Sequence, residues 1–165
     1  MNYVYLLIGG NVGDRLHNLQ QAVITIGRTC GRVVRQSAVY ETAAWGKTDQ
    51  QSFLNQALLV ETNLTAFQLL ERVLEAETLL GRVRKERYGP RIIDIDILLF
   101  NYDEIDEPDL VIPHPELQNR RFALTPLAEI APGYLHPVLG KTIQTLLAEC
   151  KDDLEVKEWT GSESQ

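Results

Sequence analysis

Apolar and polar positions along the chain follow two periods, one typical of strands and one typical of helices. Short runs rich in β-branched and aliphatic residues predict strands at residues 3–8, 33–41, 53–62 and 91–100. Apolar residues three and four apart predict amphipathic helices over 16–26, 65–80, 122–130 and 142–150. Up to residue 100 the predicted order is therefore strand, helix, strand, strand, helix, strand. Residues 161–165 carry no such pattern and predict a disordered tail.

The helix predicted over residues 65–80 opens with a capping box, because Thr65-Ala-Phe-Gln68 has the S/T-x-x-E/Q form. Glu77 falls on the predicted inner face of this helix, so its carboxylate should pair with a cation. Arg82 and Arg84 are the nearest candidates in the sequence. The apolar residues expected on that face are Phe67, Leu70, Val73, Leu74 and Leu80.

The strand at residues 91–100 carries two acids in an otherwise aliphatic run. Side chains alternate between the faces of a strand, so Asp94 and Asp96 share one face, with Cα atoms about 6.6 Å apart. The opposite face is predicted to hold Ile93, Ile95, Ile97 and Leu99. Two like charges beside an apolar strand favour a bound cation, and oxygen-only ligands suit Mg²⁺. The alternative is a solvated strand face whose acids only aid solubility.

A basic stretch leads directly into this strand. Residues 81–91 contain Arg82, Arg84, Lys85, Arg87 and Arg91 against Glu86 alone. By itself such a run is usually a solvated loop. Its adjacency to the acid pair changes the interpretation, because a nucleoside triphosphate needs both arginine forks for phosphate oxygens and a Mg²⁺ site.

Three further positions have two interpretations each, and a basic residue at a helix start has one. Trp45 stands alone in a polar connection, as a recognition element or as a side chain folded onto the core. Asn55 lies on an apolar strand face, where it either ties a loop or binds a ligand. His114 is held between two prolines, which suits a phosphate donor or a simple turn. Arg120 or Arg121 starts a helix against its dipole and should therefore meet an anion elsewhere.

The turn after the first strand is rich in glycine. Its sequence, Gly9-Gly-Asn-Val-Gly-Asp14, could hold an anion between a strand and a helix. The spacing fits neither the dinucleotide motif GxGxxG nor the P-loop GxxxxGK[ST]. A tight turn that ends in a helix N-cap is therefore the simpler interpretation.

Composition narrows the class of protein. At 165 residues the chain fits a single domain, expected over residues 1–160. A net charge of -7 argues against nucleic-acid binding. Cys30 and Cys150 show no CxxC spacing, which fits a reducing compartment. The N-terminus lacks a basic region and no apolar run approaches a membrane span, so a soluble, cytoplasmic protein with no membrane partner is expected.

Taken in order, several motifs resemble the 6-hydroxymethyl-7,8-dihydropterin pyrophosphokinase family. They are Gly9-Gly-Asn11, Phe53-Leu-Asn55, Gly81-Arg-Val-Arg84, Gly89-Pro-Arg-Ile-Ile-Asp-Ile-Asp-Ile97 and Ile112-Pro-His114 with Asn119-Arg-Arg-Phe122. The resemblance covers about residues 2 to 150. It implies an α+β fold, a ferredoxin-like antiparallel sheet with helices on both faces in three layers. It also implies diphosphoryl transfer from ATP to the pterin hydroxymethyl oxygen, with release of AMP, by a monomer.

The resemblance also implies roles for individual residues. ATP is the co-substrate, with two Mg²⁺ ions expected on Asp94 and Asp96. The residues that it assigns to catalysis are Arg82, Arg91, Asp94 and Asp96. Those that it assigns to ATP are Arg82, Arg84, Arg91, Ile97, His114 and Arg120. Those that it assigns to the pterin are Thr42, Trp45, Phe53, Asn55, Asp94 and Phe122, with Glu77 as structural support.

The sequence departs from the family pattern at three positions, and two other functions compete with the family reaction. Tyr88 stands where Trp is common, Phe53 where Tyr is common, and Pro115 where an aromatic residue can follow the histidine. These changes bear on loop closure and the sugar contact more than on transfer. A metal-dependent nucleotide hydrolase would use the same acid pair with water as the nucleophile. A ferredoxin-like sensor domain would bind ATP and form no product.

Overall fold

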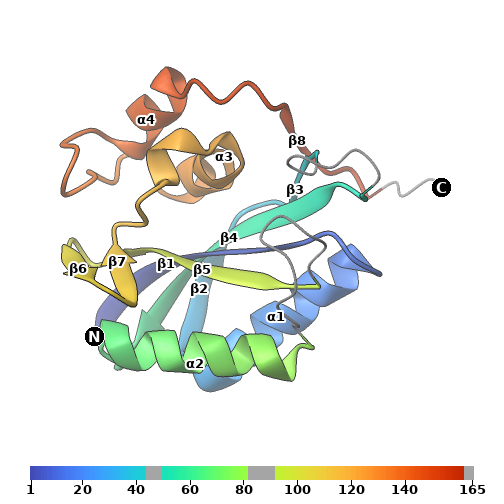
Figure 1. The fold of residues 1–165 in the computed structure, drawn as a ribbon, viewed down its shortest axis with the longest axis horizontal. Helices are drawn as coiled ribbons and strands as arrows, with labels where there is room; N and C mark the ends of the chain where they lie inside the picture. Colours follow the sequence, from blue (N-terminus) through green and yellow to red (C-terminus); the bar gives the residue numbers. More distant parts are fainter. Residues whose placement is uncertain (44–49, 82–91, 162–165) are drawn as a thin grey trace.

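An antiparallel sheet organises the molecule, and helices cover both of its faces (Figure 1). The computed structural model describes residues 1–43, 50–81 and 92–161. The strand order is β5-β1-β4-β3-β8, and β2 also pairs with β4. The strands of the sheet are β1 (Asn2–Gly10), β2 (Arg32–Gln36), β3 (Tyr40–Thr42), β4 (Phe53–Thr62), β5 (Asp94–Phe100) and β8 (Val156–Glu158).

Two helices pack on each face. The helices α1 (Arg15–Thr29) and α2 (Ala66–Leu79) lie on one side of the sheet, and α3 (Arg121–Ile130) and α4 (Ile143–Glu149) lie on the other (Figure 1). Alternate strand residues feed two separate cores, so Leu6, Leu54 and Leu58 pack with α1 and α2 while Leu7 packs with α3 and α4. The expected α+β fold, an antiparallel ferredoxin-like sheet in three layers, is confirmed.

β5 follows its predicted alternation only as far as residue 97. Asp94 and Asp96 share the α3 face, and Ile95 and Ile97 face α1 and α2, as predicted. The register against β1 shifts between Tyr5 and Leu6, which pair with Leu99 and Ile97. This irregularity leaves Leu98 as an extra residue. Leu99 therefore packs in the α3 core, so its predicted place beside Ile97 is wrong.

α2 begins with the predicted capping box. Gln68 N donates to Thr65 Oγ1 (3.2 Å), and Thr65 N donates to Gln68 Oε1 (2.9 Å). Its predicted inner face is partly wrong, because Phe67 is 49% exposed and Leu74 43% exposed. The positions that point into the core fall on a narrower stripe that includes small residues. These buried positions are Ala66, Leu69, Val73, Ala76 and Glu77.

Three short segments differ from the sequence prediction. The strand predicted at 33–41 is split into β2 and β3, and Ser37 bridges the break: its N–H donates to Ala57 O (2.9 Å) and its Oγ accepts from Ala57 N (2.9 Å). The acidic turn predicted over 101–109 contains β6 (Ile105–Glu107), which pairs with β7 (Leu110–Ile112). β8 was not predicted as a strand; it pairs with β3 at the sheet edge.

The remaining elements follow the sequence closely. Asp14 is the N-cap of α1 and accepts from His17 N (3.2 Å), which fits the tight-turn interpretation of residues 9–14. α3 follows a short 3-10 turn, η1 (Leu117–Asn119). Residues 162–165 of the predicted tail lie outside the described residues. Within the described part of the chain, no helix has the length and hydropathy that a membrane span requires.

Candidate active site

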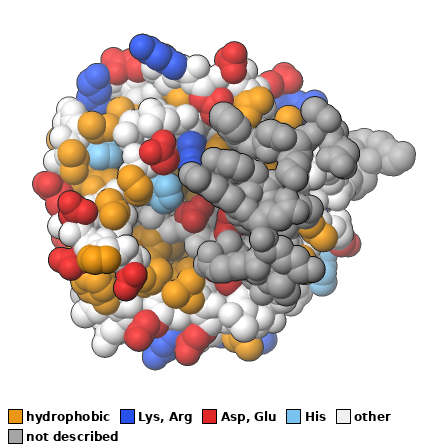
Figure 2. Space-filling view, in the orientation of Figure 1, with side chains coloured by type: hydrophobic (Ala, Val, Ile, Leu, Met, Phe, Trp, Pro, Cys, Tyr) orange, Lys and Arg blue, Asp and Glu red, His pale blue; other side chains and the backbone are white. Residues whose placement is uncertain are grey.

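A cleft of about 1000 Å³ opens beside β5, which is the edge strand of the sheet. Residues from both faces of β5 line it, so the cleft extends from the α3 face of the sheet round this edge to α2. It brings together every predicted site residue that the structure describes: Thr42, Phe53, Asn55, Asp94, Asp96, Ile97, His114, Arg120 and Phe122. On the face seen in Figure 2, a hydrophobic area borders a group of histidine, basic and acidic side chains.

The acid pair is held by the backbone of β5. Asp94 pairs with Gly9 and Asp96 with Leu7 of the neighbouring strand β1. This pairing fixes both carboxylates on one half-buried face. Glu77 of α2 is 4% exposed, and its Oε2 accepts the N–H of Ile95 at 2.7 Å. This hydrogen bond ties α2 to the residue between the two acids. The predicted partners of Glu77, Arg82 and Arg84, lie outside the described residues.

Asn55 of β4 lies on the same sheet face as the acid pair, with Gly9 of β1 between them. It is 5% exposed and pairs with Gly9, where a Cβ would overlap its side-chain oxygen. Only glycine therefore allows this close approach. Thr42 and Phe53 pair with each other beside it. Thr42 Oγ1 is buried and has no hydrogen-bond partner among the described residues, which leaves a polar group available to a ligand in the cleft.

His114 is fixed by two backbone contacts. Its N–H donates to Leu98 O of β5 at 2.9 Å, and its Nδ1 accepts from Glu116 N at 3.1 Å. Burial, together with the positive charge of Arg120, lowers the pKa of His114 to about 4. The ring is therefore neutral near pH 7, and the proton is carried by Nε2. His114 can act there as a hydrogen-bond donor without a change of charge.

Arg120 and Arg121 have different roles, although both stand at the start of α3. Arg120 lines the cleft, and its guanidinium carbon lies 5.8 Å from the centre of the Phe122 ring. Arg121 turns away, and its guanidinium donates to Asp152 O and Cys150 O, both at 2.8 Å. The Asp152 carboxylate accepts the backbone N–H of Arg121 at 3.1 Å, whereas the Arg121 guanidinium meets only carbonyl oxygens, so the anion expected for one of these side chains stays a prediction.

Several predicted site residues cannot be placed, and several lining residues were missed. Trp45, Arg82, Arg84 and Arg91 lie outside the described residues, as does Tyr88.

The sequence analysis did not identify one wall of the cleft, formed by α2 and the segment around β7. The exposed apolar positions of α2 were a signal for it. This wall includes Leu70, Leu74, Pro108, Leu110 and Val111.

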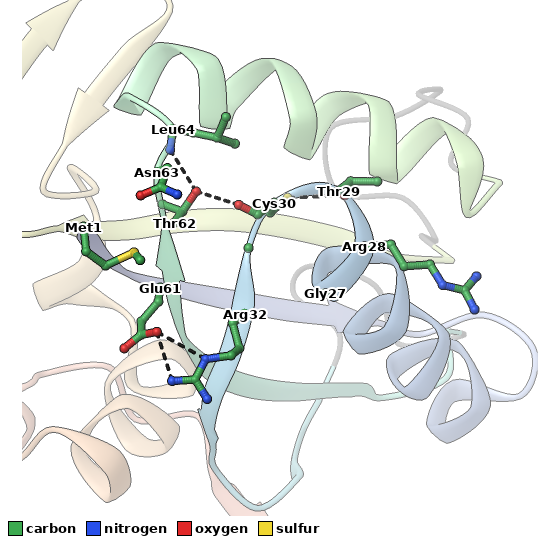
Figure 3. Close-up of a pocket in the computed structure, with 11 residues that line it drawn as sticks. Met1, Gly27, Arg28, Thr29, Cys30, Arg32, Glu61, Thr62, Asn63 and Leu64 are labelled. Carbon is green, nitrogen blue, oxygen red and sulfur yellow. Dashed lines mark hydrogen bonds and ion pairs between the residues drawn. The ribbon is translucent and has the colours of Figure 1, made fainter.

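A second hollow, of about 450 Å³, lies at the opposite end of β1 and β4 (Figure 3). Several of its polar groups already have partners within the protein. Thr62 Oγ1 donates to Cys30 O (2.6 Å) and accepts from Leu64 N (3.1 Å), while Arg32 donates to Glu61 (Figure 3). A ligand there would have to displace these contacts, so the cleft beside β5 is the better candidate.

The acid pair has the donor chemistry of a magnesium site. Asp94 and Asp96 offer only carboxylate oxygens, and both line the cleft. The described residues contain no group of three or more His, Cys, Asp or Glu that could enclose a metal. Mg²⁺ commonly takes one or two protein carboxylates and completes its shell with water and phosphate oxygens. The pair therefore fits Mg²⁺ held jointly with a phosphate ligand.

Comparison with known proteins identifies relatives over most of the chain. Residues 5–132 match the family described as 7,8-dihydro-6-hydroxymethylpterin-pyrophosphokinase (HPPK). The 2-amino-4-hydroxy-6-hydroxymethyldihydropteridine pyrophosphokinase of Methylorubrum extorquens is 45% identical over 150 residues, which cover 90% of this chain and 94% of the relative. The Bacillus subtilis protein of the same name is 45% identical over 130 residues, 78% of each chain.

A solved structure supports the fold. The HPPK-DHPS of Plasmodium falciparum superposes with a TM-score of 0.73 at 19% identity, covering 90% of this chain and 43% of that chain. At this identity the likeness concerns the fold alone, and this chain spans under half of that protein's length. The family assignment rests instead on the sequence match and the two relatives. The chain belongs to the 7,8-dihydro-6-hydroxymethylpterin-pyrophosphokinase family.

Proposed function

We propose that the cleft beside β5 is the site at which this chain carries out the family reaction. The chain transfers diphosphate from ATP to the hydroxymethyl group of 6-hydroxymethyl-7,8-dihydropterin, a step of folate synthesis. The products are AMP and the pterin diphosphate. The observation that carries the location is the half-buried pair Asp94 and Asp96 in one cleft with His114, Arg120 and the wall around Asn55.

The phosphate side of the cleft is assigned to the acid pair and the nearby donors. When Mg²⁺ is bound by Asp94 and Asp96, two ions being expected with ATP, it neutralises charge on the phosphate oxygens. His114 donates from Nε2 to the triphosphate, and Arg120 adds positive charge beside it. Because phosphoryl transfer depends mainly on positioning and charge stabilisation, fixed donors suffice. The sequence also assigns ATP contacts to Arg82, Arg84, Arg91 and Ile97, with Arg82 and Arg91 acting in catalysis.

The pterin side is assigned to the part of the cleft around β3 and β4, on the far side of β1 from the acid pair. A flat, amide-rich ring suits two aromatic faces and an amide that reads its edge. Asn55 supplies that amide, and the buried Thr42 hydroxyl is a further partner. Phe53 and Phe122 are the proposed aromatic faces. Asp94 would lie near the hydroxymethyl group, and Trp45 is assigned to the same side on sequence grounds.

The proposal includes a monomer in the cytoplasm that acts on small molecules alone. Cys30 and Cys150 are both unpaired, as expected in a reducing compartment. Sedimentation equilibrium at the protein concentration used for turnover tests the oligomeric state, because a dimer would have twice the mass of the single chain.

The decisive experiment is product analysis with ATP, Mg²⁺ and 6-hydroxymethyl-7,8-dihydropterin. We expect AMP and pterin diphosphate in equal amounts, with neither formed after addition of a chelator or omission of the pterin. AMP or ADP formed without pterin would instead identify a hydrolase. Saturable ATP binding with no product under any condition would identify a sensor domain, and either result would refute the proposal.

A further inference from the structure

Arg15 is a buried cation at the first position of α1. Only 4% of its surface is exposed, and it directly follows the N-cap Asp14. The helix dipole disfavours a positive charge at a helix N-terminus, and a buried guanidinium is costly unless it is ion-paired and hydrogen-bonded. The helix itself therefore gives no reason for an arginine at this position. The reason lies in what its side chain contacts.

The Arg15 guanidinium joins the two ends of the connection between β3 and β4. Its Nη1 donates to the carbonyl oxygen (3.0 Å) and the hydroxyl (2.9 Å) of Ser52 and lies 3.5 Å from Glu41 Oε2. The Ser52 hydroxyl donates in turn to Glu41 Oε2 at 2.6 Å. With the Gln51 amide oriented to satisfy its neighbours, its oxygen accepts from Arg15 Nε at 3.1 Å.

Asn11, which is 3% exposed, joins the chain after β1 to the same connection. Its Nδ2 donates to Gln50 Oε1 (2.9 Å) and to Gln51 O (3.0 Å). In the orientation given above, the Gln51 amide nitrogen donates to Asn11 O at 3.3 Å. Buried polar groups that satisfy one another in this way favour a single geometry. We call the following residues the anchor network: Asn11, Arg15, Glu41, Gln51 and Ser52.

The anchor network adjoins residues that line the cleft. Thr42 directly follows Glu41, Phe53 directly follows Ser52, and the two are paired in the β3–β4 register. β3 has only three residues, so its ladder provides few bonds to fix this pairing. Closing the connection between the two strands also costs conformational entropy. Movement of Glu41 or Ser52 would therefore displace Thr42 and Phe53 in the cleft wall.

We infer that Arg15 is a positioning residue for the pterin side of the cleft. Arg15 is not one of the described residues that line the cleft. It acts through its contacts with Glu41 and Ser52. By fixing both ends of the connection, it holds Thr42 and Phe53 in register beside Asn55. The identity of the ligand rests on the proposed function, whereas the anchoring of the two strands does not.

The substitution Arg15→Lys tests this inference, because lysine keeps the charge but loses the planar fork of donors. We expect the KM for the pterin to rise about tenfold or more while the KM for ATP changes by less than about twofold, since small displacements of one substrate are costly. The matched control is Arg32→Lys. Arg32 pairs with Glu61 at 3.0 Å, at the opposite end of β4 (Figure 3), and should alter neither constant.

Amide hydrogen exchange provides a readout that needs no turnover. In Arg15→Lys, exchange of the amides of residues 53–55 should accelerate, while amides at the 60–62 end of β4 keep the wild-type rate. Wild-type pterin KM and wild-type exchange would overturn the inference. Equal increases in both KM values with faster exchange along all of β4 would also overturn it, since a general loss of stability would then explain the defect.

The inference stays testable if Arg15→Lys does not fold, and also if the wild-type protein forms no product. If Arg15→Lys does not fold, Glu41→Gln takes its place, because glutamine keeps an acceptor for Ser52 and removes only the ion pair. The same split between the two KM values and the same local exchange are expected, and their absence overturns the inference. If the wild-type protein forms no pterin diphosphate, the proposed function fails. The exchange measurement then still decides whether Arg15 anchors β3 and β4.

Discussion

The two faces of the sheet use alternate residues of the same strands for different purposes. On the α1 and α2 face, Leu6, Leu54 and Leu58 are fully buried in a continuous apolar core. On the α3 and α4 face, Leu7 is packed, but Gly9, Asn55 and Asp94 line the cleft. The difference shows that the cleft forms where the second helix layer leaves one end of the sheet open. Substitutions on the two faces should therefore separate activity from stability.

The largest effect is expected at the acid pair. Asp96→Asn should lower kcat/KM by at least about 10³-fold, or about 4 kcal/mol, because the Mg²⁺ site loses one of its carboxylates. Steady-state kinetics of the variant and the wild-type protein at saturating Mg²⁺ test this statement. Turnover at the wild-type rate would refute the assignment of Asp96 to the metal.

The opposite result is expected on the other face of β4. Leu58 is fully buried against α1 and α2, and Leu58→Ala should lower the free energy of unfolding by about 2–5 kcal/mol. Its KM values should stay at the wild-type level at temperatures where the variant is folded. Thermal unfolding and kinetics at low temperature provide the measurement. A specific loss of pterin or ATP affinity would contradict the separation of the two faces.

Glu77 links the two faces and should show an intermediate effect. Glu77→Ala removes the acceptor for Ile95 N, which should cost about 1–3 kcal/mol of stability. It should also lower kcat about tenfold by loosening the residues that carry the acid pair. Glu77→Gln is the matched control, because its amide oxygen can still accept from Ile95, and it should retain most of the activity. Wild-type kcat in Glu77→Ala would show that Glu77 does not position the acid pair.

Local patterns predicted the parts of the fold and the site that depend on neighbours in the sequence. The capping box at Thr65 and the shared face of Asp94 and Asp96 follow from spacing alone, and both are present. The face of the sheet on which Leu99 packs could not be predicted in this way, because it depends on the register of β5 against β1. The contacts of Arg15 with Glu41 and Ser52 likewise join segments far apart in the chain.

The apolar pattern of α2 indicated part of the cleft wall, although it was interpreted as core alone. Phe67 and Leu74 are apolar and regularly spaced, yet both are exposed, because α2 packs through small residues such as Ala66 and Ala76. Leu70 and Leu74 of this stripe line the cleft, so the apolar pattern marked a wall of the cleft as well as a core. β8 has three residues, only one of them apolar, and it forms because the edge of β3 is open to it. Such a strand depends on tertiary context more than on propensity.

The smallest effect is expected in the connection between α3 and α4, away from the cleft. His136 is 3% exposed, and its Nδ1 accepts from Val138 N (3.2 Å) and Leu139 N (3.0 Å). Burial lowers the pKa of His136 below its ordinary value. The folded state therefore binds fewer protons than the unfolded state as the pH falls below about 6.5. Protonation of Nδ1 would also break both hydrogen bonds.

Stability should consequently fall on acidification. Between pH 7 and pH 5.5 we expect the free energy of unfolding to fall, with part of the loss due to His136. His136→Asn is the comparison, because its side-chain oxygen can accept the same two N–H groups but does not titrate. The variant should show a smaller change between the two pH values. Equal changes in the two proteins would show that His136 does not contribute.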